Sequence, residues 1–154
     1  MGQRSVVYGY INARSNADIE VNLQALARFP FDELYPFRNN FWVESAPKYQ
    51  YPSIFFGGTY KEIEGDWPIW LWKFTQLLST LEATEANVTL DCWLGRFSWR
   101  LEPRWLVEGG SVGDLDTMTG QQWIIVEAPE NESELEDLYD EDRTLSVERR
   151  QQRT

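Results

Sequence analysis

Carboxylates at alternate positions are the residues of this chain whose spacing could support chemistry. Glu62, Glu64 and Asp66 occupy every second position, and Asp114 and Asp116 repeat that spacing later in the chain. Such groups can bind Mg²⁺ or Ca²⁺, or act as a general acid and base. The later pair, however, lacks the closing glutamate and further ligands of a calcium-binding EF-hand loop. We therefore expect no metal site and interpret both groups as a solvated strand end and a polar turn.

Other catalytic chemistries lack the residues they need. The 154-residue chain has no histidine, which excludes Ser-His-Asp and Cys-His catalysis. Its single cysteine, Cys92, excludes a disulfide framework and a Cys-based zinc site, and we expect it to be buried. The glycine-rich segment 109–113 leads into Asp114 instead of a phosphate-binding ending, which indicates a loop. We predict that the protein is not an enzyme and needs no cofactor. A hydrolase built on a carboxylate pair stays an alternative, because its two groups would meet only in the fold.

The charge of the chain restricts its partners. It carries 14 Lys and Arg against 25 Asp and Glu, a net charge of −11, so we expect no direct contact with nucleic acid phosphates. Residues 130–142 hold eight acids and no base, and four arginines follow. We predict one globular domain over 1–128 and a mobile or loosely docked tail over 129–154. Since no stretch supplies the roughly 20 apolar residues of a membrane span, we expect a cytoplasmic protein.

Hydrophobic periodicity predicts a domain of mixed helices and strands. Segment 6–11 is typical of a buried strand, and segment 54–63 of a second one, whose glycine pair at 57–58 indicates a bulge or a close backbone approach. Amphipathic helices are predicted over 17–29 and 67–82. A short strand is expected near 40–44.

The remaining apolar segments predict an antiparallel sheet. Apolar positions alternate from Val88 and change parity at Gly95, which indicates a hairpin turn or a bulge. Strands near 105–107 and 123–126 would close the sheet around a loop over 109–120. The order of elements predicts an α+β fold, an antiparallel-dominated sheet with two helices packed on one face. We expect six large side chains of the helices and their ends in the core: Leu23, Leu26, Trp70, Phe74, Leu77 and Leu81.

Aromatic residues are abundant, at 8 Trp, 7 Tyr and 8 Phe, and core packing explains several of them poorly. Trp72 lies opposite the apolar stripe of the second predicted helix. Trp93 falls on the same alternate positions as the polar residues Thr89 and Asp91. Trp42 and Tyr49 lie in the proline-rich connection 30–53. Exposed aromatics beside acids are typical of a protein-binding hot spot, although the connection could instead fold over them. We predict a partner-binding surface built from these aromatics and two of the alternating acids: Trp72, Trp42, Tyr49, Trp93, Glu62 and Glu64.

Three segments carry a resemblance to a known family: 5–11, 57–60 and 66–71. Over about residues 5–105 the chain resembles the immunity proteins of bacterial polymorphic-toxin and contact-dependent inhibition systems. The resemblance implies a small acidic protein of the cytosol that binds and blocks one cognate toxin domain. We expect that toxin domain to have a basic surface. A phage-type inhibitor that mimics nucleic acid is the alternative. Such an inhibitor would present an ordered stripe of carboxylates on its folded body.

Overall fold

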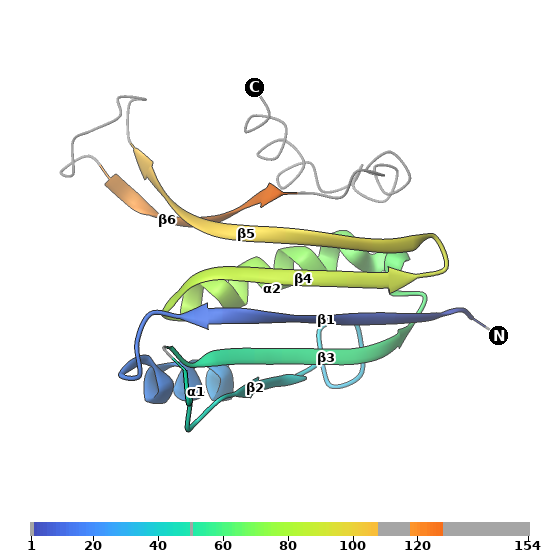
Figure 1. Ribbon diagram of the computed structural model, residues 1–154. Coiled ribbons are helices and arrows are strands. Elements are labelled where there is room, and N and C mark those ends of the chain that lie inside the picture. Colours follow the sequence, from blue (N-terminus) through green and yellow to red (C-terminus); the bar gives the residue numbers. More distant parts are fainter. Residues whose placement is uncertain (1, 50, 108–117, 128–154) are drawn as a thin grey trace.

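The computed structural model describes residues 2–49, 51–107 and 118–127. Most of the predicted loop 109–120 and the whole tail 129–154 lie outside the described residues. In the described part, six strands form one sheet in the order β2-β3-β1-β4-β5-β6, and every neighbouring pair is antiparallel (Figure 1). The strands are β1 (Arg4–Ala13), β2 (Phe41–Val43), β3 (Ser53–Lys61), β4 (Ala83–Cys92), β5 (Gly95–Val107) and β6 (Met118–Glu127).

Two helices cover one face of this sheet. They are α1 (Asp18–Arg28) and α2 (Trp67–Thr80), and the 3-10 turn η1 (Ile63–Asp66) leads from β3 into α2. Both helices contribute side chains to a single core cluster with the strands, and they also contact each other. Figure 1 shows α2 running behind β4 and β5. The predicted α+β class, with an antiparallel sheet and two helices, is confirmed.

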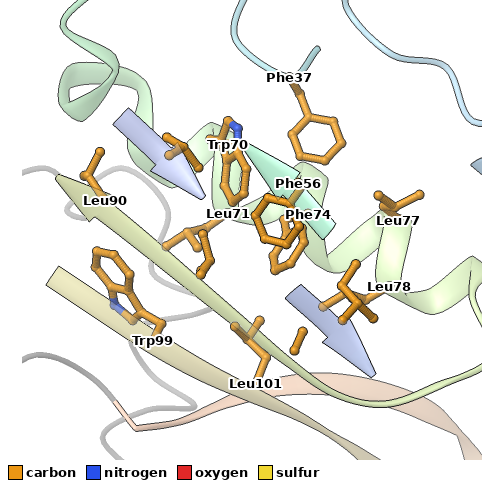
Figure 2. Close-up of a cluster of buried hydrophobic side chains, with 14 of the residues drawn as sticks. Phe37, Phe56, Trp70, Leu71, Phe74, Leu77, Leu78, Leu90, Trp99 and Leu101 are labelled. Carbon is orange, nitrogen blue, oxygen red and sulfur yellow. The ribbon is translucent and has the colours of Figure 1, made fainter. Parts of the chain in front are cut away.

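The core forms where the apolar stripe of α2 meets the inward side chains of the strands. Trp70, Phe74 and Leu77 of α2 are buried, as predicted, and so are Leu26 and Leu81. Figure 2 shows the α2 side chains packed against rings and leucines from β3, β4 and β5. Close contacts between apolar atoms of this kind make the core the main source of stability. The strand residues labelled in that view are Phe56, Leu90, Trp99 and Leu101.

The predicted core face of α1 is wrong at one position. Leu23 is 41% exposed, and the neighbouring Asn22 is buried in its place. The Asn22 side-chain oxygen accepts the backbone N–H of Glu82 at 2.8 Å, and its amide donates to the Glu82 carbonyl oxygen at 3.2 Å. Buried backbone groups require such partners. The backbone of Glu82, in the connection between α2 and β4, therefore holds Asn22 in the core, where the apolar pattern predicts Leu23.

Glycines mark two of the predicted irregularities. Cys92 pairs with Gly95 across a two-residue turn, and Gly95 has a φ of +142°, so the change of parity is a β4–β5 hairpin. At 57–58, β1 and β3 pair without a register shift, so no bulge forms. A Cβ on Gly58 would lie 2.4 Å from Nδ2 of Asn40. The glycine pair therefore forms no bulge, and the group that comes close to Gly58 is the Asn40 side chain and not the backbone approach that the sequence suggests.

Candidate partner-binding surfaces

The face of the sheet opposite the helices carries four exposed rings. Alternation along β1, β2 and β3 places Tyr8, Tyr10, Trp42 and Phe55 there, because their neighbours in sequence face the core. Trp42 is 62% exposed and Phe55 41%. Phe55 pairs with Trp42 on one side and with Tyr10 on the other, and the Trp42 and Phe55 rings stack with centroids 5.7 Å apart. We call these four residues the open-face patch.

The other half of the same face is polar and its charges are paired. On β4 and β5, Asp91 lies 3.2 Å from Arg96, and Glu85 lies 3.6 Å from Arg100. Arg100 also contacts Glu102 and Glu127. The hydroxyl oxygens of Thr89 and Ser98 are 2.8 Å apart. Because three carboxylates share the Arg100 guanidinium, this half carries four acids against two arginines and a net negative charge. It lies beside an apolar half formed by the open-face patch.

The predicted aromatic residues do not lie on one surface. Trp72 is 47% exposed on the outer side of α2, where Ile69 lies one turn away. Trp93 is 65% exposed in the β4–β5 turn, and Tyr49 is exposed in the connection before β3. Trp42 is the only one of the four in the open-face patch. Since α2 and that patch lie on opposite sides of the sheet, one flat contact cannot include both Trp42 and Trp72.

The exposure of Trp72 leads to a prediction about stability. Replacing Trp72 with alanine should change the free energy of unfolding by no more than about 0.5 kcal/mol, as for an ordinary surface substitution. Urea denaturation of the two proteins measures this directly. A loss of about 3–5 kcal/mol, the usual result at a buried tryptophan, would mean that Trp72 packs into the core.

The structure separates the two predicted acidic residues. Glu62 is exposed, with a left-handed backbone φ of +51°, whereas Glu64 of η1 is buried and accepts a hydrogen bond from the Ser5 hydroxyl. Glu64 is therefore not an available surface charge. Nearby, Tyr35 donates to Asp66. Burial, this hydrogen bond and the neighbouring carboxylates raise the pKa of Tyr35 above its usual range.

The Ser5–Glu64 contact is a second point where stability can be tested. Replacing Ser5 with alanine removes the donor to a buried carboxylate, which should lower the free energy of unfolding by about 1–3 kcal/mol. Ser98→Ala is the matched control, because that serine is hydrogen-bonded on the solvated face. Equal losses for the two variants in urea denaturation would contradict the structural role of Ser5.

Among the described residues, no group of three or more His, Cys, Asp or Glu is arranged to hold a metal ion. Cys92 is buried, as predicted, and that burial raises the pKa of its thiol. A raised pKa keeps the thiol protonated and unreactive.

Three residues of the open-face patch are absent from the predicted surface: Tyr8, Tyr10 and Phe55. The sequence predicts a buried strand at 6–11, but only alternate residues of β1 face the core. The available signal is parity, since the two tyrosines alternate with Val7 and Ile11. Tyrosine is common both in buried and in half-buried strands. Two tyrosines at alternate positions among apolar residues therefore do not reveal an exposed face.

Comparison of the chain with protein-family models, with curated proteins and with solved structures finds no match. None of the described helices has the length and apolar character needed to cross a membrane. The fold and its surfaces define an α+β protein whose sheet has one helix-covered face and one open face. These surfaces are the basis on which a function is proposed.

Proposed function

We propose that this protein is an immunity protein that binds a cognate bacterial toxin domain and blocks it. The observation that carries the proposal is the open-face patch, in which Trp42, Phe55, Tyr10 and Tyr8 form a contiguous exposed aromatic surface. Contiguous exposed apolar patches mark interaction sites in soluble proteins. Large, rigid rings contribute much of the binding energy at protein interfaces for little loss of side-chain entropy.

Charge complementarity indicates the kind of partner. A net charge of −11 attracts a basic protein from a distance and accelerates its association. Toxin domains that act on nucleic acids carry basic clefts, so such a domain is the occupant we propose for the open face. Neutralisation requires no reaction by this protein, only occupation of the toxin's active site or of its moving parts. It would take place in the cytoplasm, where the toxin acts.

Two observations favour this function over the alternatives. Mimicry of nucleic acid needs carboxylates spaced in an ordered row, whereas on the open face Asp91 is paired with Arg96 and three further carboxylates cluster around Arg100. A hydrolase needs two carboxylates facing one site. The pair suggested by sequence is divided between an exposed Glu62 and a buried Glu64.

A surface depression elsewhere gives a hydrolase no better support. A depression of about 590 Å³ beside the 29–40 connection is lined by Asp32 and Glu33. The Asp32 carboxylate forms an ion pair with Lys73 of α2 and accepts the backbone N–H of Phe37 at 3.3 Å. It is therefore engaged in holding the connection onto α2, which favours a binding protein over an enzyme.

Co-expression tests the proposal. A reading frame adjacent to this gene that encodes a candidate toxin would be truncated to its C-terminal domain and expressed with and without this protein. We expect the domain to arrest growth alone and growth to be restored by co-expression. Trp93→Ala is the control variant, because it removes an equally exposed indole that lies outside the patch. Arrest that persists in the presence of the wild-type protein would contradict the proposed function.

A further inference from the structure

One acid on the open face has no cationic partner. Among the described residues of this face, four carboxylates contact Arg96 or Arg100. A further acid, Glu44, directly follows β2, and its backbone N–H donates to the Ser53 carbonyl oxygen at 2.9 Å, continuing the β2–β3 register. Alternation therefore places the Glu44 side chain on the same face as Trp42, two residues earlier. No hydrogen bond or ion pair engages its carboxylate within the described chain.

The groups around Glu44 make it a different kind of site from the rest of the face. The next position across the sheet is occupied by Ser53 and Asn12, whose side chains bond each other at 3.2 Å. Asn12 also donates to Glu85 at 3.2 Å, so this chain of hydrogen bonds ends on an acid that is already paired with Arg100. Glu44 is left two residues from Trp42, whose ring stacks on Phe55. The strand β2 is the edge strand of the sheet at this end of the strand order (Figure 1).

We infer that Trp42, Phe55 and Glu44 form a cation site that accepts an arginine side chain of the partner protein. The inference deepens the proposed function, because it assigns the partner chemistry recognised by the open-face patch. A guanidinium is planar, so it can stack on an exposed aromatic face while its N–H groups reach a carboxylate. Lysine offers a compact, strongly hydrated charge that uses the rings less well. A basic toxin domain supplies arginines for this purpose.

Nuclear magnetic resonance titration tests the site without the toxin. The probes are arginine with blocked ends (N-acetylated and amidated), the corresponding lysine compound and the corresponding uncharged citrulline compound. We expect the arginine probe to shift the Trp42 indole N–H signal with a saturable curve while the Trp93 indole, equally exposed, stays unchanged. Citrulline should bind at least about fivefold more weakly, since it keeps the planar shape but loses the charge.

Two variants locate the charge. Glu44→Gln should weaken arginine binding by about fivefold or more, whereas Glu62→Gln, the same change at an exposed acid elsewhere, should leave it unchanged. Equal shifts at Trp42 and Trp93, no shift at Trp42, or an unchanged affinity in Glu44→Gln would each overturn the site. Lysine binding as tightly as arginine would overturn the assignment to arginine.

The two proposals fail separately. Growth arrest that persists on co-expression, together with selective arginine binding, removes the toxin-neutralising function and leaves the cation site. Growth protection by a protein that does not bind the arginine probe removes the cation site and leaves the function.

Discussion

Replacing Trp70 with alanine is expected to lower the free energy of unfolding by about 3–5 kcal/mol, the usual loss when a core tryptophan is truncated. Trp70 is buried, and its ring centroid lies 4.7 Å from that of Trp67 and 5.0 Å from that of Phe74. No nearby side chain is free to fill the space, because these rings are themselves held in the packed core. Urea denaturation measures the loss.

The matched control makes the same chemical change in the β4–β5 turn. Trp93→Ala removes an indole that is 65% exposed, so we expect a change within about 0.5 kcal/mol. Similar losses for the two variants would contradict the assignment of Trp70 to the core and of Trp93 to the surface.

Removing the two stacked rings of the open-face patch should weaken binding of the proposed toxin partner by about 30-fold or more. This corresponds to the roughly 2 kcal/mol that defines a hot-spot truncation. The double variant Trp42→Ala/Phe55→Ala takes away the most exposed part of the patch and should keep its core intact, because neither side chain faces α2. Titration calorimetry gives the affinity, and the unfolding transition of the free variant confirms that it is folded.

The helix α2 and the β4–β5 hairpin could both be predicted from local sequence patterns. The apolar residues of 67–81 recur with a helical period, and α2 buries Trp70, Phe74 and Leu77 as that period requires. The change of parity at Gly95 identifies the β4–β5 hairpin, because a strand cannot change its buried face without a turn or a bulge.

What sequence could not predict depends on contacts between distant segments. Asn22 replaces Leu23 in the core because its side chain hydrogen-bonds the backbone of Glu82. That partner is 60 residues away in the chain, so the local pattern does not reveal it. Glu62 and Glu64 have the spacing of two residues on one strand face. However, β3 ends at Lys61, and the left-handed backbone of Glu62 directs the chain into η1, which turns Glu64 inward.

The candidate surface was only partly predictable for a related reason. Trp42 stands out in sequence because a proline-rich connection surrounds it. Tyr8, Tyr10 and Phe55 do not stand out, because they lie among apolar residues that could be covered on both sides of the sheet. The helices α1 and α2 pack on the opposite face of the sheet, and this packing leaves the three rings exposed.

The most direct test of the account compares the two aromatic surfaces in one binding measurement. The C-terminal domain of the proposed toxin, inactivated by substitution, would be titrated into three proteins: the wild type, Trp42→Ala/Phe55→Ala and Ile69→Ala/Trp72→Ala. We expect tight binding by the wild type, a loss of about 30-fold or more for the open-face variant, and little change for the helix-face variant. No binding by the wild type, or a loss confined to the helix-face variant, would contradict this expectation.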